Sequence, residues 1–572
     1  MFKIMAKTTL GSVLVLSLLL SACSKNNNGA PAASGSQATS SESQPAASES
    51  ASASSPAIDP LGKYDPPIEI TTFRSTNETL EANLPAGETL DKNRWLDAFE
   101  QDLGIKVKYD WVAKAGDQYD QKINLSLSSG ALPDIIPVNV NQLKQLAESD
   151  QIEDLTAAFE QYASPLTKEL LMQEGDRPFN AAKFNGKLMG IPSIASSRET
   201  QNFVWIREDW LKNLGLTPPK TMQDLLKIAE AFTKNDPDQN GKNDTQGLAL
   251  IKDLTNVGYA VLEGFFNGYH AYPGIFVKDA NGKLVYGSTQ KEMIAPLTQL
   301  HQMYVDGIID KEFITKDAGK VGEDTVAGKN GMFFGAHWNF AWPIQLVHDA
   351  NVKADYQAYP IVSIDDKMAM TEVNLATNTY YAVKKGSKNP EAIVKLINMF
   401  LEKNYGATND FNKYYRDTEG HELWSLSPFS ALPPNKNIEN NIAILDAIKN
   451  NDNSKLNPES MSVWDNVMKY KNDKDEANHG WFKAFSENGV GDLMVQYAND
   501  NRHIFNEFYG APGDNMKKYS ATLLKFEKEM ITKFIVGKEP LSNFDKYVAD
   551  YNKLGGEAIE KEVNEWSQSL QK

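Results

Sequence analysis

Three short apolar segments separated by two helical patterns begin the folded part of the chain and constrain its fold most strongly. Residues 68–73 and 105–111 alternate between faces, and residues 132–138 form an apolar run, so each is expected to be a strand. Residues 94–101 and 117–129 have helical spacing, and the glycine after the second of these is placed as a helix C-cap. Strand, helix, strand, helix, strand predicts a parallel, doubly wound α/β sheet.

The amino-terminal residues have the pattern of an export signal. Lys3 and Lys7 precede an apolar run over residues 11–20, and Ser21-Ala22-Cys23 follows, with small residues before the single cysteine of the chain. The run is shorter than the roughly 20 apolar residues that a transmembrane helix needs. The motif resembles a bacterial lipobox, which predicts a signal peptide over 1–22, lipidation of Cys23 by acyl chains such as palmitate, and a location on the outer face of the cell membrane. An ordinary secretory signal with a chance cysteine is the alternative.

Residues 23–60 are expected to be a disordered tether behind this lipid anchor. Residues 24–56 are mostly small and polar and contain no aromatic side chain, so they bury too little apolar surface to offset their ordering entropy. A flexible chain of about 35 residues reaches roughly 30–35 Å, which would hold the folded part near a membrane.

The folded part is large and acidic. The 572 residues include 75 Asp and Glu against 58 Lys and Arg, a net charge of −17, and 41% are hydrophobic. This length supplies enough core for two or more lobes. An acidic surface argues against nucleic acid or an anionic polymer as the main partner and suits neutral solutes and cations.

Beyond residue 192 the pattern is mainly helical. Residues 205–214 are expected to form a helix, and so is most of the carboxyl-terminal third of the chain. There, Leu523, Phe526, Met530 and Phe534 form a stripe at helical spacing, which indicates a core face and carries no functional claim.

Several short motifs follow one another in an order that resembles a known family. They are GALPDII at residues 130–136, NGKLMGIP at 185–192, IREDWL at 206–211 and GKNGMFF at 328–334. Together with the lipobox and the tether, they resemble the extracellular solute-binding proteins of carbohydrate ABC importers, in the long Gram-positive lipoprotein branch.

The resemblance implies a monomeric α/β protein with the two-lobed, periplasmic-binding-protein-like (type II) clamp and a largely helical carboxyl-terminal third. An oligosaccharide would sit in the cleft between the lobes, at the carboxyl ends of parallel strands, and would be delivered to a membrane permease. The implied lobes are residues 61–192 with 355–405, and residues 193–354 with 406–572.

An acidic loop after a predicted helix has the spacing of a calcium loop. Between Asp236 and Asp244, side-chain oxygens occupy positions 1, 3, 5 and 9, glycine occupies position 6, and Lys242 at position 7 would supply its main-chain carbonyl. Position 12 is Gly247, where an EF-hand has glutamate, so water or Thr245 would have to replace that ligand. Similar loops occur in alginate-binding relatives of the family, and a polar turn is the alternative. The expected ligands of a structural calcium ion are Asp236, Asp238, Asn240, Lys242 and Asp244.

Sugars need flat aromatic rings together with polar side chains around the rim of a cleft. In maltodextrin-binding relatives a tryptophan near Trp338 stacks on a sugar ring, so Trp338 is the expected stacking residue, whereas Trp342 is expected to pack against protein. Other candidates follow predicted strands or the Gly-Ile-Pro turn, and each has a surface or hinge role as its alternative. These further candidates are Arg74, Thr76, Asn139, Ser193, Arg198, Trp205 and Glu372.

Catalysis finds little support in the sequence. The histidines lack metal-ligand spacing, and there is no His-Glu-x-x-His, no Gly-x-Ser-x-Gly elbow and no phosphate-binding loop. The chain is therefore expected not to be an enzyme. A surface lipoprotein that hydrolyses polysaccharide and a peptide-binding receptor of the same fold are the alternative hypotheses.

Overall fold

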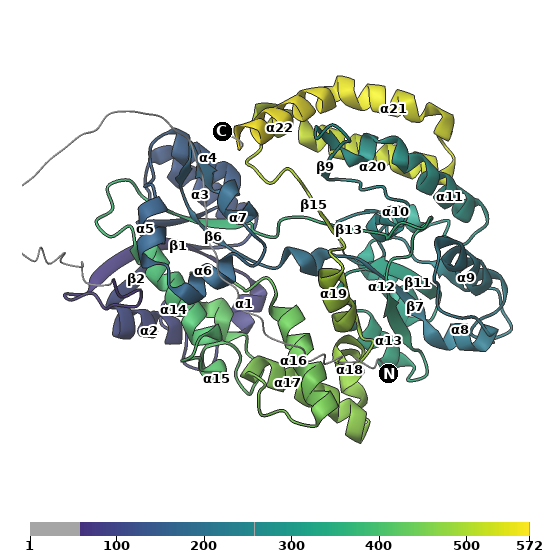
Figure 1. Cartoon of the computed structure of the whole chain (residues 1–572), viewed down its shortest axis with the longest axis horizontal. Helices are drawn as coiled ribbons and strands as arrows, with labels where there is room; N and C mark the ends of the chain where they lie inside the picture. Colours follow the sequence, from purple (N-terminus) through teal and green to yellow (C-terminus); the bar gives the residue numbers. More distant parts are fainter. Residues whose placement is uncertain (1–57, 257, 571–572) are drawn as a thin grey trace, which may run out of the picture. The chain divides into compact units, whose positions relative to one another are not determined.

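The computed structural model of the protein describes residues 58–256 and 258–570 (Figure 1). The predicted signal peptide over 1–22, Cys23 and nearly all of the tether lie outside these described residues. Within the described part of the chain, no helix is long and apolar enough to cross a membrane.

The first sheet confirms the pattern at the start of the folded chain. Its strand order is β2-β1-β3-β14-β6, with β1 parallel to β2 and β3, and with β14 antiparallel to β3 and β6. Gly130 ends α3 in the left-handed conformation, with φ of 71°, as expected of a C-cap glycine. The bounds are β1 Ile68–Thr76, α2 Arg94–Leu103, β2 Ile105–Lys114, α3 Asp117–Ser129, β3 Ile135–Val138, α4 Val140–Glu148, α5 Thr156–Tyr162, α6 Pro165–Leu171, α7 Arg177–Ala181, β6 Ile191–Ser193, β14 Thr379–Val383 and α14 Ala392–Tyr405.

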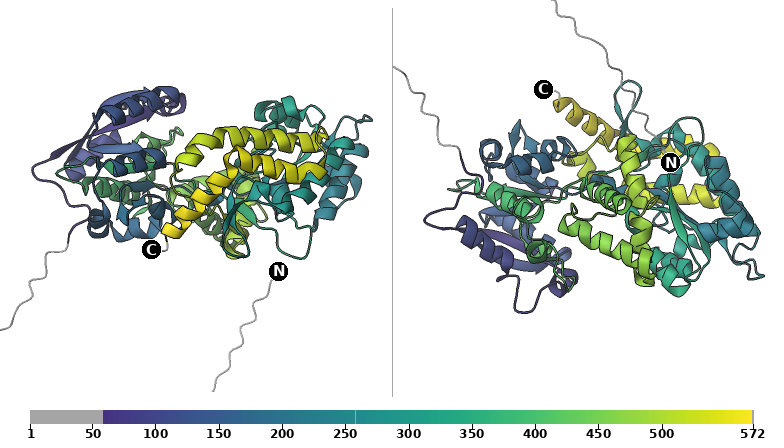
Figure 2. Two further views of the ribbon diagram at one scale, coloured as in Figure 1. Left: turned by 90° about the horizontal axis from the view of Figure 1, so that it is seen from above. Right: turned by 60° about the horizontal axis from the view of Figure 1, so that its bottom comes forward.

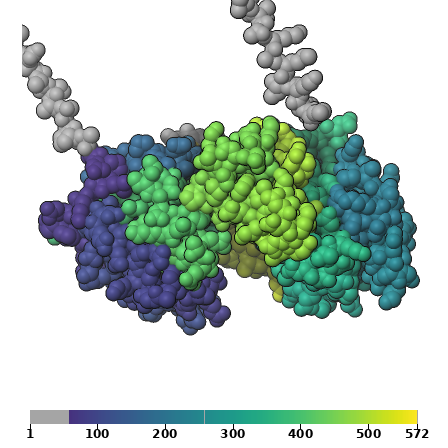
Figure 3. All heavy atoms as spheres, turned by 90° about the horizontal axis from the view of Figure 1, so that it is seen from below, coloured from purple at the N-terminus to yellow at the C-terminus, as the bar shows by residue number. Residues whose placement is uncertain are grey.

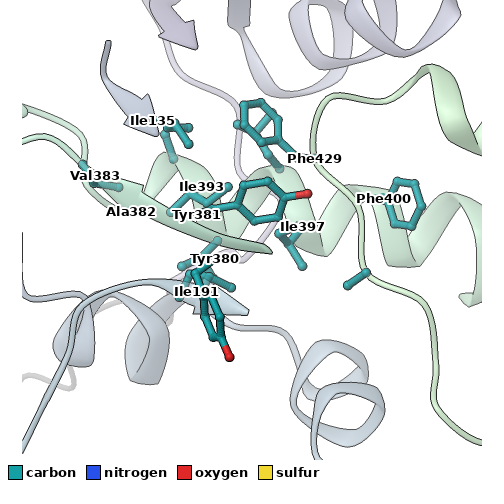
Figure 4. Close-up of a cluster of buried hydrophobic side chains, with 14 of the residues drawn as sticks. Ile135, Ile191, Tyr380, Tyr381, Ala382, Val383, Ile393, Ile397, Phe400 and Phe429 are labelled. Atoms are coloured by element: carbon teal, nitrogen blue, oxygen red, sulfur yellow. The ribbon is translucent and has the colours of Figure 1, made fainter. Parts of the chain in front are cut away.

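Strand β14 lies in the middle of the first core. Its side chains alternate between the two faces of the sheet, so Tyr381 points toward Phe429 while Tyr380 points to the opposite side (Figure 4). The rings of Tyr381 and Phe429 meet edge to face, with centroids 5.5 Å apart. Ile393 and Ile397 of α14 are buried in the same cluster, which fixes this helix against the sheet.

The second sheet has the order β12-β7-β11-β8 and is covered on both faces. Strand β7 is buried throughout: Val204 and Ile206 belong to one core cluster, and Phe203 and Trp205 belong to the other. Residues 205–207 therefore belong to a buried central strand. The helix expected over 205–214 is wrong in its first turn and begins at Glu208 instead. The bounds are β7 Phe203–Arg207, α8 Glu208–Leu214, α9 Met222–Lys234, β8 Gln246–Leu248, α11 Ile294–Val305, β11 Asn330–Gly335, α13 Ile344–Ala350 and β12 Tyr356–Tyr359.

Helices of the carboxyl-terminal third complete both cores of the second lobe (Figure 2). The helices α16 to α19 join the cluster that holds Trp205, and α20 to α22 join the cluster that holds Val204. In α20, Leu523 and Phe534 of the predicted stripe are buried, and Phe526 packs half-buried beside them. The bounds are α16 Lys436–Asn450, α17 Pro458–Met468, α18 His479–Phe485, α19 Val490–Asn499, α20 Asp514–Val536, α21 Phe544–Tyr551 and α22 Glu557–Ser569.

The chain returns to the first lobe later than the expected residue 355. Residues 355–405 were expected there, but β12 pairs with β7 in the second sheet, and the return is made by β14. The chain also leaves later than residue 405, because Leu423, Leu426 and Phe429 are buried in the first core. Within the described residues, the chain passes between the first core and the cores of the second sheet over residues 195–202, 374–378 and 432–437.

Hydrogen bonds tie these three connections to one another. The Ala376 amide donates to Ser197 Oγ at 3.0 Å, and the Leu432 amide donates at 2.8 Å to the carbonyl of Ile194, directly before the first connection. The Arg198 guanidinium donates to Asn435 Oδ1 at 2.6 Å. A cluster of short crossing segments is the arrangement that hinge motion between two lobes requires.

Candidate ligand-binding site

A hollow of about 620 Å³ lies at the carboxyl ends of β1 and β3. Loops collect at this edge of a parallel sheet, which is the usual place for a ligand in an α/β fold. Three of the predicted residues, Arg74, Asn139 and Ser193, line this first hollow together with Tyr381 and Trp424. These three residues therefore lie at one edge of the candidate site.

Each of these three predicted side chains is engaged with protein. Asn139 accepts hydrogen bonds from the amides of Asn141 and Gln142, both at 3.0 Å, and thereby caps α4. Ser193 donates to the Ser430 carbonyl at 2.7 Å. Their side chains therefore shape the wall of the first hollow as well as lining it.

Arg74 holds the opposite wall in place. Its guanidinium donates to the carbonyls of Ser425 and Ser427, at 2.6 and 2.9 Å. Trp424 lies directly before this segment, half-buried, and its indole N–H donates to Glu422 Oε2 at 2.6 Å. Arg74 thus links the end of β1 to the loop that carries a tryptophan into the hollow.

A second hollow, of about 350 Å³, shares Glu422 and Trp424 with the first. Its far wall comes from the second lobe and is aromatic. The rings of Trp481 and Phe485 stack with centroids 5.8 Å apart, and Phe340 lies 5.2 Å from Trp481. Figure 3 shows residues of the green part of the chain, which includes α16 and α17, between the purple and teal parts. The second hollow therefore has walls from both lobes, whereas the first hollow, which adjoins it, is lined by the first lobe and by Asn378 of a connection.

Polar side chains surround the aromatic wall of the second hollow. Lys436 forms an ion pair with Glu459 at 2.5 Å, and the Tyr415 hydroxyl donates to the same carboxylate at 3.0 Å. Arg416 pairs with Glu422 at 3.0 Å. Flat rings combined with such polar groups suit a ligand that presents both C–H faces and hydroxyls.

Trp338 lies outside the residues that line the two hollows in the described chain. It is 37% exposed, and its indole covers Gly258, where a Cβ would come within 2.9 Å of Trp338 Cζ2. Its neighbours His337 and Phe340 do line the second hollow. Trp342 packs edge-on against Tyr259, at 4.8 Å, as expected of a packing residue.

Three of the predicted contacts are buried and need correction. Trp205 is fully buried in the second core and donates to the Ala336 carbonyl at 3.3 Å. Glu372 is buried in the second lobe, where it accepts a hydrogen bond from Asn267 at 3.0 Å. Thr76 is buried and donates to Glu81 at 3.2 Å. Arg198 lies in a connection between the lobes, which agrees with the hinge role given as its alternative to ligand binding.

Trp424 and Tyr381 were missed as candidates in the sequence. Tyr381 lies in an apolar strand, where alternation alone does not tell a core ring from one at the sheet edge. Trp424 offered a better signal, because it stands in a Ser-rich loop without helical periodicity. Trp481 lies in α18, and the packing of this helix brings it to the second hollow.

The acidic loop brings three carboxylates together. Asn240 Nδ2 donates to Asp238 Oδ2 at 2.7 Å and to Asp244 Oδ1 at 3.1 Å, and the Gly241 amide donates to Asp236 Oδ2 at 3.0 Å. Burial, together with the neighbouring Asp236 and Asp244, raises the pKa of Asp238. Hard oxygen donors of this kind fit calcium.

The remainder of the loop departs from an EF-hand. Gly247 lies in β8, where a Cβ would collide with the main chain of Ala229 in α9, so no glutamate fits at position 12. Thr245 is buried and donates to the Phe232 carbonyl at 2.8 Å, so this alternative to the missing ligand at position 12 is engaged with protein. In the described residues, no group of three or more His, Cys, Asp or Glu is arranged to hold a metal ion.

A sequence profile of the bacterial extracellular solute-binding proteins matches residues 80–407, more than half of the chain. The chain therefore belongs to this family, which is one of binding proteins and not of enzymes. The expected family, the two-lobed α/β fold and the absence of catalysis are confirmed.

Two curated relatives and one solved structure illustrate the relationship. Lipoprotein LipO of Bacillus subtilis (strain 168) is 31% identical over 42% of this chain and 46% of its own length. The polygalacturonan/rhamnogalacturonan-binding protein YtcQ of the same organism is 22% identical over 83% of this chain and 88% of its own length. The structure of FusA, an ABC-transporter substrate-binding protein of Streptococcus pneumoniae, in complex with kestose has a TM-score of 0.57 at 16% identity and covers 88% of this chain and 99% of that chain.

Proposed function

We propose that this protein is the solute-binding component of an ABC importer and captures an oligosaccharide in the cleft formed by the two adjoining hollows. The observation that carries the proposal is the pair of hollows itself, with Trp424 between them and walls from both lobes. FusA, which shares the fold, has been solved in complex with kestose, and YtcQ is named for binding polygalacturonan and rhamnogalacturonan. The captured sugar would pass to a membrane permease.

Capture would work by closure of the lobes without chemistry. We propose that the first lobe comprises residues 61–194 and 379–431, and that the second lobe comprises the remaining folded residues. The three connections near Ser197, Ala376 and Leu432 would act as hinges. A ligand that contacts both walls favours the closed state by its differential affinity for it.

Thermal unfolding in the presence of a panel of neutral and acidic oligosaccharides tests the proposal. A sugar at 100 times its Kd adds about 2.7 kcal/mol to the free energy of unfolding, so a true ligand raises Tm measurably. Shifts by one or a few related oligosaccharides are expected. If none of the panel moves Tm, and reducing ends appear instead, the protein is a hydrolase and the proposal is wrong.

We also propose that Cys23 anchors the protein to the outer face of the membrane. The lipobox spacing supports this, and LipO is named a lipoprotein. The wild-type chain should partition into detergent in phase separation, and a Cys23→Ala variant should partition into water. Equal partitioning of the two would contradict lipidation.

Finally, we propose that the loop over 236–244 binds calcium through Asp236, Asp238, Asn240, Asp244 and the carbonyl of Lys242. FusA has been solved as an EF-hand mutant, which supports a loop of this kind in the fold. Calcium should raise Tm and a chelator should lower it. An Asp238→Asn variant should lose this response. A Lys242→Ala variant is the matched control, because only its main chain would bind, and it should keep the response. A wild-type Tm that ignores both calcium and chelator would contradict the proposal.

A further inference from the structure

The charged side chains around the two hollows show an asymmetry between cations and carboxylates. Three cations line them, and each of these already lies against protein acceptors. Arg74 donates to two main-chain carbonyls, Arg416 pairs with Glu422 at 3.0 Å, and Lys436 pairs with Glu459 at 2.5 Å. The Nε atoms of Arg74 and Arg416 are shielded from solvent as well.

His337, the histidine that lines the second hollow, adds no positive charge at neutral pH. It is buried, and its ring lies 3.4 Å from the Glu199 carbonyl. Burial lowers the pKa of His337, so the imidazole is neutral.

Two carboxylates in the lining form no ion pair within the described chain. Asp120, at the edge of the first hollow, is exposed and takes part in no ion pair within the described chain. Glu199, in the second hollow, accepts a hydrogen bond from the Asn437 amide at 2.6 Å, and an amide does not neutralise its charge. Arg74 keeps its positive charge in the same way, because it meets only main-chain carbonyls. Taken together, the linings of the two hollows carry one carboxylate more than cations, with Asp120, Glu199, Glu422 and Glu459 against Arg74, Arg416 and Lys436.

We infer that the cleft selects uncharged oligosaccharides and rejects the same sugars when they carry carboxylates. This inference rests on the proposed function and narrows its substrate class. A uronate entering the cleft would meet Asp120 and Glu199. To reach a cation it would have to displace a carboxylate from Arg416 or Lys436, or the main-chain carbonyls from Arg74. A neutral sugar meets only hydrogen-bonding groups and rings. The expected preference is opposite to the one that the name of YtcQ records for that protein.

A matched set of ligands tests the inference by isothermal titration of the full chain. Kestose, maltotriose, galactotriose and trigalacturonate are titrated first. The neutral sugar that binds best is then compared with its own derivative oxidised to carboxylates at the primary hydroxyls, and with the methyl ester of that derivative. The ester keeps the added bulk and removes the charge.

The acid should bind at least tenfold more weakly than its ester at low salt, and the gap should narrow at high salt because screening weakens the repulsion. An Asp120→Asn, Glu199→Gln double variant should also narrow it at least threefold. The control is Asp97→Asn with Glu100→Gln on the exposed face of α2, which makes the same change in net charge and should leave the gap unchanged.

Every other result overturns the inference. If the ester binds as weakly as the acid, the added bulk and not the charge causes the loss of affinity. If the acid binds as tightly as the ester, the cleft does not discriminate by charge. Binding of trigalacturonate without any neutral sugar overturns the inference while the proposed function stands. If no sugar binds, the proposed function fails and the inference falls with it.

Discussion

Replacing Arg74 with methionine tests how the cleft is built. The substitution keeps the apolar stem of the side chain and removes the guanidinium that donates to Ser425 and Ser427 at 2.6 and 2.9 Å. The loop that carries Trp424 would then lose its link to the end of β1. Both stability and ligand affinity should fall, because the same loop lines both hollows.

The loss of stability follows from the two hydrogen bonds. A hydrogen bond to a charged donor contributes about 1.5–3 kcal/mol, and partial exposure reduces the sum to about 2–3 kcal/mol for the pair. With about 2.1 cal/mol/K per residue over roughly 510 residues, the unfolding entropy is about 1.1 kcal/mol/K, so Tm should fall by about 2–3 °C. Sugar affinity should fall about tenfold as the tryptophan loses its fixed position.

Calorimetry of the variant, followed by titration with the best oligosaccharide, measures both quantities. Lys106→Met on the exposed edge of β2 is the control and should change neither. If Arg74→Met loses binding while its Tm equals that of the wild type, then Arg74 contacts the sugar directly. The positioning role argued from the structure would be refuted.

Three further predictions concern stability. Burial raises the pKa of Glu263 to about 7, above its usual 4.5. Between these values the folded state binds a proton that the unfolded state has released, so stability is lost as pH rises from 4.5 to 7. Glu263→Gln should therefore add about 3 kcal/mol to the free energy of unfolding at pH 8, measured in urea, and a variant no more stable than the wild type would contradict this. Burial, with nearby arginines, lowers the pKa of His503 to about 4, below its usual 6.5, so the free energy of unfolding should fall by about 3 kcal/mol as pH drops from 6.5 to 4. His503→Gln should reduce this dependence on pH, and an unchanged slope would refute the prediction. Gly331→Ala should lower the free energy of unfolding by about 1–3 kcal/mol, because its Cβ would collide with Phe232. A Tm equal to that of the wild type would show that the core repacks around the added methyl group and would contradict this.

The elements with a clear period were predictable from the sequence, and their partners were not. Alternation located β1 and β2, and helical spacing located α3 with Gly130 at its end. Pairing depends on residues far apart in the chain, so nothing local in Tyr356–Tyr359 distinguishes the second sheet from the first. The lobe boundary was misplaced for this reason.

The same limit applies to the candidate site. Arg74, Asn139 and Ser193 were found because polar residues that follow parallel strands meet at one edge of the sheet. Trp205 was misjudged because an aromatic residue in a short segment fits a core and a cleft equally well. Trp424 reaches the cleft only through tertiary packing. Its loop packs on the first core but lies far from β6 in the chain, because the Ser193–Ser430 hydrogen bond that joins them spans 237 residues.

Titration of three tryptophan variants with the best neutral oligosaccharide tests the central claim most directly. Stacking contributes through rings that face the ligand, so Trp424→Ala and Trp481→Ala should each weaken binding about tenfold or more, with the fold retained by circular dichroism. Trp338→Ala, outside the two hollows, should bind as tightly as the wild type. Loss of binding in Trp338→Ala alone, with the other two variants unaffected, would place the ligand elsewhere and contradict the account.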